Sequence, residues 1–136
     1  HVRMARHCEN GQAVAEFLAS HPKIAYVNYC GLPGDKYHAV AEKYLPNGSC
    51  GVVSFGVKGG RKAAAAFMGH LKIAAIETHV ADARTCCLHP ASSTHRQMND
   101  EQLIAAGVQP DLVRMSCGLE DKNDLIHDIA QALDQI

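Results

Sequence analysis

The chain has 136 residues, of which 47% are hydrophobic, and its 13 basic and 14 acidic side chains give a formal net charge of -1. This length fits one domain whose core folds without disulfides or metal, and the near-neutral charge does not favour nucleic acid as a partner. Neither an apolar run of the roughly 20 residues that cross a bilayer nor the apolar core of a signal peptide is present. We therefore expect a soluble, cytoplasmic protein with no membrane partner.

The first half of the chain predicts helices and strands in alternation. From residue 4 to residue 18, small or apolar side chains recur in steps of four and three, which is typical of a helix with one buried face. His21-Pro22 ends this helix. The expected buried face consists of Met4, Cys8, Gly11, Ala15 and Leu18, with Val14 and Phe17 beside it. Strands are expected at residues 24–29 and 51–57, and helices at residues 36–44 and 61–71.

The second half predicts shorter elements. Asn99 and Gln102 have the spacing of a capping box, which predicts a short helix that Gly107 ends in left-handed conformation. Asp121 is expected to cap a final helix whose apolar stripe runs to Ile136. Extended segments are expected at residues 73–76, 85–88 and 112–117.

The connections between these elements are too irregular for repeated βαβ units. We therefore predict an α+β fold with a small, mainly antiparallel sheet covered by helices on one face. No internal repeat or interdomain linker is visible, so residues 1–136 are expected to form one domain.

The cysteines and the nine histidines do not predict a metal site or a disulfide framework. No cysteines form a C-x-x-C pair, and no histidines form an H-x-x-x-H pair. We interpret most of the cysteines as small buried hydrophobic residues in a reducing compartment. They are Cys8, Cys30, Cys50, Cys86, Cys87 and Cys117.

Arg114 is the most informative residue of the expected strand at 112–117. Alternation turns Val113 and Met115 toward one face and Arg114 toward the other. A guanidinium in mid-strand is costly to bury without an anion, and its planar fork suits two parallel hydrogen bonds to a carboxylate. Arg114 is thus a candidate carboxylate-binding residue, although a solvated sheet face or a structural ion pair also fits its position.

Two other polar segments carry a weaker signal. Ser92-Ser93-Thr94-His95 has hydroxyls and an imidazole but no assigned carboxylate, so it does not make a catalytic triad. A turn stabilised by its own side-chain to backbone hydrogen bonds fits this segment. Gly56-x-x-Gly59-Gly60 matches neither the dinucleotide-binding nor the P-loop spacing, and we predict a turn there.

Several segments, taken together and in chain order, resemble the C-terminal region of the Cys/Met-metabolism pyridoxal-phosphate (PLP) enzymes. The similarity spans nearly the whole chain and implies the C-terminal domain of a fold-type I PLP-dependent transferase. The segments are Arg6-His7-Cys8-Glu9-Asn10, Val27-Asn28-Tyr29, residues 51–60, Asp82-Ala83-Arg84-Thr85, residues 89–95, residues 105–108, residues 110–114 and Ser116-x-Gly118-x-Glu120.

The resemblance implies substrate-binding roles for three residues. Arg114 matches the family arginine that binds the α-carboxylate of the substrate, and Thr94 matches a hydroxyl position that lines the active site. His79 stands close to the bound carboxylate, where relatives commonly have Ser or Asn. Ala81 replaces a frequent glycine beside it.

The resemblance also implies a longer enzyme whose N-terminal domain holds PLP on a lysine and pairs its pyridine nitrogen with an aspartate. We therefore expect residues 1–136 to be a substrate-side domain without catalytic, cofactor-binding or metal-binding residues and without activity in isolation. A homotetramer is expected for the full-length protein. None of the lysines stands in the family's Ser-x-x-Lys type setting; they are Lys23, Lys36, Lys43, Lys58, Lys62, Lys72 and Lys122.

The implied reaction replaces the acetate of O-acetylhomoserine with sulfide or a thiol, which gives homocysteine or methionine. Arg114 and Thr94 do not separate this transfer from the reactions of cystathionine γ-lyase, methionine γ-lyase or cystathionine γ-synthase in the same family. A non-catalytic α+β interaction module is the alternative from a different functional class.

Overall fold

Five strands form one sheet in the order β1-β2-β5-β4-β3 in the computed structural model, which describes residues 1–136. All neighbouring strands are antiparallel except β3, which runs parallel to β4. The predicted α+β fold with a mainly antiparallel sheet is therefore confirmed. The strands are β1 (Ile24–Asn28), β2 (Val52–Val57), β3 (Ala75–Ile76), β4 (Cys86–Leu88) and β5 (Leu112–Ser116).

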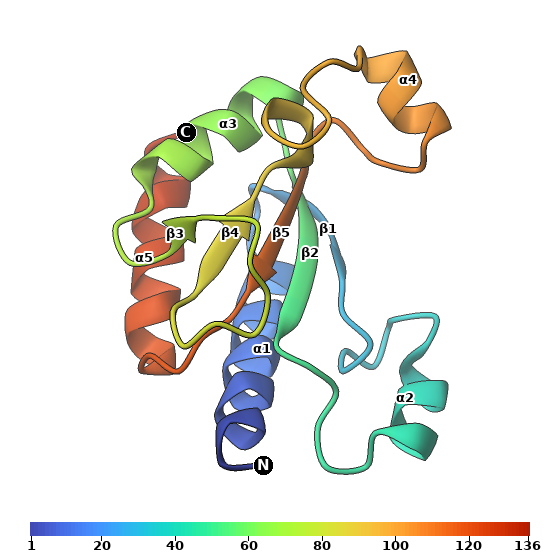
Figure 1. Ribbon diagram of the computed structural model, residues 1–136, viewed down its shortest axis with the longest axis vertical. Coiled ribbons are helices and arrows are strands. Elements are labelled where there is room, and N and C mark those ends of the chain that lie inside the picture. Colours follow the sequence, from blue (N-terminus) through green and yellow to red (C-terminus); the bar gives the residue numbers. More distant parts are fainter.

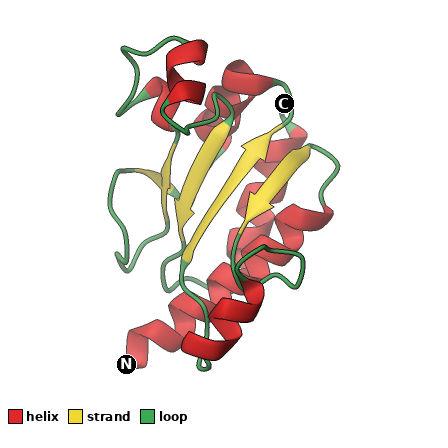
Figure 2. Cartoon of the chain, turned by 90° about the vertical axis from the view of Figure 1, so that its right-hand side faces the viewer, coloured by secondary structure: helices red, strands yellow, loops and turns green.

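Three helices, α1, α3 and α5, pack side by side and cover one face of the sheet (Figures 1 and 2). The opposite face has no helical layer (Figure 2). No helix combines the length and the hydropathy needed to cross a membrane. The helices are α1 (Val2–Ser20), α2 (His38–Tyr44), α3 (Gly60–His70), the 3-10 turn η1 (Pro90–Ser92), α4 (Asp100–Ala105) and α5 (Lys122–Asp134).

The core lies between these helices and the two central strands. Strand alternation buries Val53 and Phe55 of β2 and Val113 and Met115 of β5 completely. Phe55 meets Phe67 of α3 edge to face, with ring centroids 5.8 Å apart. Each such side chain contributes about 1.5–3 kcal/mol when it is removed from water. The burial of these side chains therefore stabilises β2 and β5.

The predicted helix ends are confirmed by their hydrogen bonds. The Asn99 side chain accepts from the Gln102 amide at 2.9 Å, and the Gln102 side chain accepts from the Asn99 amide at 3.0 Å. Gly107 has a φ of +79° after α4. The Asp121 carboxylate accepts from the Asn123 amide at 2.8 Å and so caps α5.

The predicted buried face of α1 is wrong at its N-terminal end. Met4 is half exposed and Cys8 is only partly buried, whereas His7 and Asn10 are buried. These two polar side chains find backbone hydrogen-bond partners inside the protein, which offsets the loss of water. Ile136 also lies outside its expected element, because α5 ends at Asp134.

All six cysteines are free thiols, and three of them, Cys86, Cys87 and Cys117, are fully buried. Burial raises the pKa of Cys117 to about 12 and raises the pKa of Cys87 as well. These thiols are therefore protonated at neutral pH and pack as small hydrophobic groups, as the sequence predicts. The other three cysteines are only partly buried, so the prediction that most of the cysteines are buried holds for three of the six.

Asp128 of α5 holds the segment that leads into β3. Its carboxylate is 4% exposed and accepts from the backbone amides of Lys72, Ile73 and Ala74 at 2.8, 2.9 and 3.1 Å. This segment has no regular structure of its own, so these bonds fix where β3 starts.

Asp128→Ala should lower the free energy of unfolding by about 2–3 kcal/mol, because three amides lose a charged acceptor. Urea denaturation followed by circular dichroism measures this change. Asp134→Ala, at the exposed end of the same helix, is the matched control and should shift the midpoint little. Equal losses in the two variants would contradict the role given to Asp128.

Candidate functional site

Arg114 lies at the centre of β5, opposite Ser54 of β2 and Leu88 of β4. Because its neighbours Val113 and Met115 are buried on the helix-covered side, alternation turns Arg114 toward the open side of the sheet. Its side chain is partly exposed there. Ladders on both sides of β5 hold the backbone of this residue firmly.

The Arg114 guanidinium is oriented by backbone carbonyls alone. Its Nη2 donates to the carbonyl of Thr78 at 2.7 Å and to that of His79 at 3.5 Å. None of the ion pairs in the chain involves Arg114, and its Nε is buried without a partner. The structural ion pair left open by the sequence is thereby excluded, and a positive charge with free donors remains on the open sheet face.

The two carbonyls belong to the β3–β4 loop, residues 77–85. The Ser116 hydroxyl, two residues after Arg114, accepts from the Ala81 amide at 3.0 Å. Arg3 of α1 donates to the Ala81 carbonyl. Ala81 has a φ of 57°, a left-handed backbone conformation that residues other than glycine rarely adopt. The backbone of the loop is therefore strained at Ala81, two residues after His79, whose carbonyl contacts Arg114.

Glu120 fixes the far end of this loop. Its carboxylate accepts from the Thr85 amide at 2.6 Å and from the Thr85 hydroxyl at 2.8 Å. The Thr85 hydroxyl in turn accepts from the Gly118 amide at 2.8 Å. A Cβ on Gly118 would lie 2.4 Å from the Ala83 carbonyl oxygen, so only glycine permits this approach.

Helix α1 supports residues 117–120, which follow β5 and contact the end of this loop. His7 Nδ1 donates to the Cys117 carbonyl at 2.7 Å, and Asn10 Nδ2 donates to the carbonyls of Gly118 and Glu120 at 3.0 and 2.8 Å. Sequence reasoning gave His7 and Asn10 no role. Two polar residues three positions apart beside an apolar helix face were the available signal.

The His79 side chain lies next to this arrangement but does not join it. Its imidazole is 62% exposed, and its Nδ1 lies 4.0 Å from a carboxylate oxygen of Glu77. It borders an open pocket of about 620 Å³ that Arg3 and Ala81 also line. The structure thus brings His79 and Arg114 together through the backbone and leaves the imidazole facing solvent.

Thr94 lies on a different segment, between η1 and α4, and is exposed. Its hydroxyl is 2.9 Å from Nδ1 of His95 and makes no hydrogen bond to Arg114 or His79. The Ser93 hydroxyl donates to the His89 carbonyl at 2.7 Å, which confirms the expected turn stabilised by its own side chains. Within this chain, therefore, Thr94 remains separate from the other two predicted site residues.

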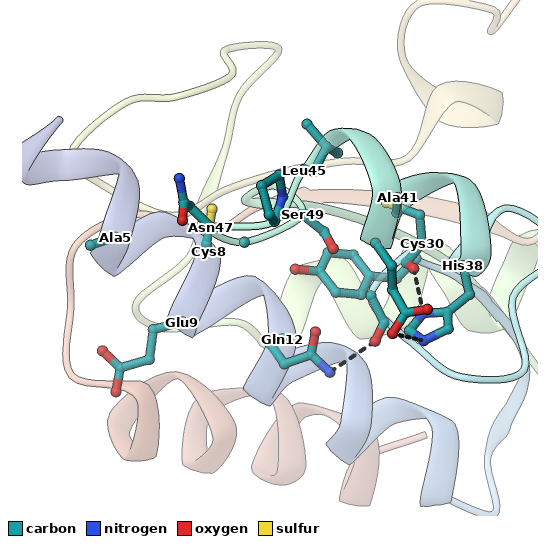
Figure 3. Close-up of a pocket in the computed structure, with 15 residues that line it drawn as sticks. Ala5, Cys8, Glu9, Gln12, Cys30, His38, Ala41, Leu45, Asn47 and Ser49 are labelled. Atoms are coloured by element: carbon teal, nitrogen blue, oxygen red, sulfur yellow. Dashed lines mark hydrogen bonds and ion pairs between the residues drawn. The ribbon is translucent and has the colours of Figure 1, made fainter.

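A second pocket, of about 570 Å³, lies between α1 and the segment that carries α2 (Figure 3). Gln12 and His38 stand on its walls, and His38 Nδ1 donates to the Cys30 carbonyl at 2.9 Å. Its charged groups include the carboxylates of Glu9 and Glu42 but no arginine or lysine. This pocket is therefore unsuited to an anionic ligand, unlike the surroundings of Arg114.

Comparison with known proteins agrees with the sequence resemblance. Residues 1–134 match the model of a family described as Cys/Met metabolism PLP-dependent enzyme. A homocysteine synthase of Schizosaccharomyces pombe is 44% identical over 98% of this chain. An O-acetyl-L-homoserine sulfhydrylase of Leptospira meyeri is 44% identical over 99% of the chain. The chain spans only 31% of the length of each of these relatives.

A solved structure from Campylobacter jejuni, described as an O-acetylhomoserine (thiol)-lyase, superimposes on this chain with a TM-score of 0.89 and 36% identity. The match covers 98% of this chain and 32% of that one, which contains a pyridoxyl-lysine phosphate. Proteins named L-methionine gamma-lyase also match, at 36% to 40% identity. The relatives thus carry the names of more than one reaction.

Ala81→Gly should raise the free energy of unfolding by about 0.5–1 kcal/mol, because it relieves the left-handed strain at this position. Thermal unfolding of the variant and the parent measures the difference. Ala83→Gly, in the same loop but without a positive φ, should instead lower stability. If both substitutions destabilised the protein equally, the turn at Ala81 would not be strained.

Proposed function

The chain belongs to the Cys/Met metabolism PLP-dependent enzyme family, and on this basis we propose that it is the C-terminal, substrate-side domain of an O-acetylhomoserine sulfhydrylase. The full-length enzyme replaces the acetate of O-acetylhomoserine with sulfide or a thiol and forms homocysteine or methionine. This chain binds the α-carboxylate of the amino-acid substrate through Arg114. A cofactor domain outside the chain completes the active site.

The unpaired guanidinium of Arg114 is the observation that supports this proposal. Backbone carbonyls at 2.7 and 3.5 Å fix its Nη2 but leave its charge unneutralised. Nη1 makes no hydrogen bond within the chain, so its two N–H donors are available to the oxygens of a carboxylate. A substrate carboxylate at this edge gains both charge pairing and a defined orientation.

The other two predicted site residues have supporting parts in the proposal. The exposed His79 imidazole lies beside the carboxylate-binding position and limits the space around the substrate. The exposed Thr94 hydroxyl, whose contact within the chain is to His95, lines the substrate position in this proposal. Neither residue carries a proton-transfer step in this proposal.

The residues of this chain do not fit a PLP site of their own. The Nζ atoms of Lys23, Lys58 and Lys122 bind backbone carbonyls or Glu9. Those of Lys36 and Lys43 lie over the rings of the tyrosines that follow them in the sequence. The two remaining lysines, Lys62 and Lys72, are exposed, and the pocket that Lys72 lines carries the carboxylates of Asp124 and Asp128. We propose that the cofactor is held by the domain outside this chain, and that the chain alone is inactive.

A γ-elimination such as that of the methionine γ-lyases is the second candidate, because relatives with that name match at 36% to 40% identity. The transferase is preferred because the relatives at 44% identity are named homocysteine synthase and O-acetyl-L-homoserine sulfhydrylase. Both reactions need the α-carboxylate to be held, so the role of Arg114 is common to them.

The full-length protein, supplied with PLP, O-acetylhomoserine and sulfide, should form homocysteine and acetate in equal amounts. Chromatography of the products measures both. Methionine alone serves as the comparison substrate and should release little methanethiol. Rapid release of methanethiol and 2-oxobutyrate from methionine, without transfer from O-acetylhomoserine, would identify the protein as a lyase instead.

In the full-length enzyme, Arg114→Leu should raise KM for the amino-acid substrate on the order of a hundredfold, since the bound carboxylate loses its charged partner. Arg114→Lys should recover part of the loss, because lysine keeps the charge but not the planar fork. Steady-state kinetics and equilibrium binding of the amino acid measure these effects. Arg6→Leu, on the exposed side of α1, is the control for a lost arginine. Unchanged amino-acid binding in Arg114→Leu would refute the proposal.

A further inference from the structure

The loop that carries Thr94, residues 91–99, needs support from outside itself. Its backbone hydrogen bonds are local turns: the amides of Ser93 and His95 donate to the Pro90 carbonyl, and the amide of Met98 donates to the His95 carbonyl. No strand of the sheet pairs with this backbone. Such a segment keeps one conformation only if its ends are fixed.

Arg61 of α3 fixes both ends of the loop with one side chain. Its Nη1 donates to the Ala91 carbonyl at 2.6 Å, and its Nη2 donates to the Met98 carbonyl at 3.1 Å. Its Nε and Nη2 also donate to one carboxylate oxygen of Asp100, at 2.8 and 2.6 Å. One guanidinium therefore joins the beginning of the loop, its end and the first residue of α4.

The position of Arg61 follows from the turn before it. Gly59 and Gly60 have φ angles of +105° and +73°, which glycine adopts without strain. They turn the chain sharply from β2 into α3 and place Arg61 in the first turn of that helix, beside the loop that precedes α4 (Figure 1). The glycine pair that the sequence predicts as a turn thus directs this side chain.

A second residue, His89, fixes the start of the loop. His89 is buried, and its Nε2 donates to the Pro110 carbonyl at 2.9 Å, so its Nδ1 accepts from the Ser92 hydroxyl at 2.7 Å. The bonds of His89 reach only as far as Ser93. Beyond Ser93, the side-chain support of the loop comes from Arg61.

We propose that Arg61 is a positioning residue: it holds the loop of residues 91–99 in one conformation, so that Thr94 has a fixed position relative to the substrate. This inference rests on the proposed function for the role of Thr94, but the effect of Arg61 on the loop does not. An exposed ion pair that contributes only general stability would act on all parts of the protein alike. A positioning residue acts locally and through Thr94.

Hydrogen exchange with mass spectrometry on the full-length protein tests the local effect. Arg61→Met should speed exchange of peptides covering residues 92–98 about tenfold, while peptides of β2 and β5 keep their protection. Arg61→Lys should not restore the loop, because an ammonium group cannot reach three acceptors with fork geometry. Lys62→Met, an exposed neighbour on the same helix, is the matched control. Unchanged exchange in the loop, or equal loss in β2 and β5, would overturn the proposal.

A double-mutant cycle with Thr94→Val tests the link to the substrate. Arg61→Met alone should raise KM for the amino-acid substrate on the order of tenfold with a smaller change in kcat, because a displaced hydroxyl no longer contributes to substrate binding. In the Thr94→Val background it should change KM less than twofold, since the group that it positions is absent. Fully additive effects would overturn the proposed route through Thr94. A silent Thr94→Val would refute the function proposed for Thr94, whereas the exchange experiment would still decide whether Arg61 holds the loop.

Discussion

The constraint on which the rest of this structure depends is a guanidinium held in place without a counter-ion. Arg114 sits in a strand that is paired on both sides, and its side chain hydrogen-bonds only to backbone carbonyls of the β3–β4 loop. Carbonyl dipoles orient the group but leave its full charge available to an anion. An internal carboxylate in their place would have neutralised this charge and competed with an external anion.

Holding that loop requires residues far apart in the sequence. Ser116 fixes the turn at Ala81, Gly118 permits the loop to approach β5, and Glu120 fixes Thr85. The residues of α1 that support the same segment are polar and buried, which explains why its apolar face is displaced from the predicted one. These buried polar contacts hold the segments on either side of Arg114 in place.

Arg114 on the open sheet face and Thr94 on its loop make no hydrogen bond to one another. The chain spans 31% of the length of its curated relatives. Within the chain, Arg114 and Thr94 are fixed independently, one by the β3–β4 loop and the other by Arg61. In the proposed function, one substrate contacts both of these points and a domain outside this chain.

Sequence alone determined the order of helices and strands, the alternation that turns Arg114 away from the core, the caps of α4 and α5 and the family. These features depend on local periodicity and on short runs of neighbouring residues, and both are visible in the sequence itself. The tertiary structure decided that Arg114 has no acidic partner, that His7 and Asn10 are buried, and that Arg61 reaches the Thr94 loop. Each of these depends on contacts between residues at least 30 positions apart, and no local pattern encodes such a contact.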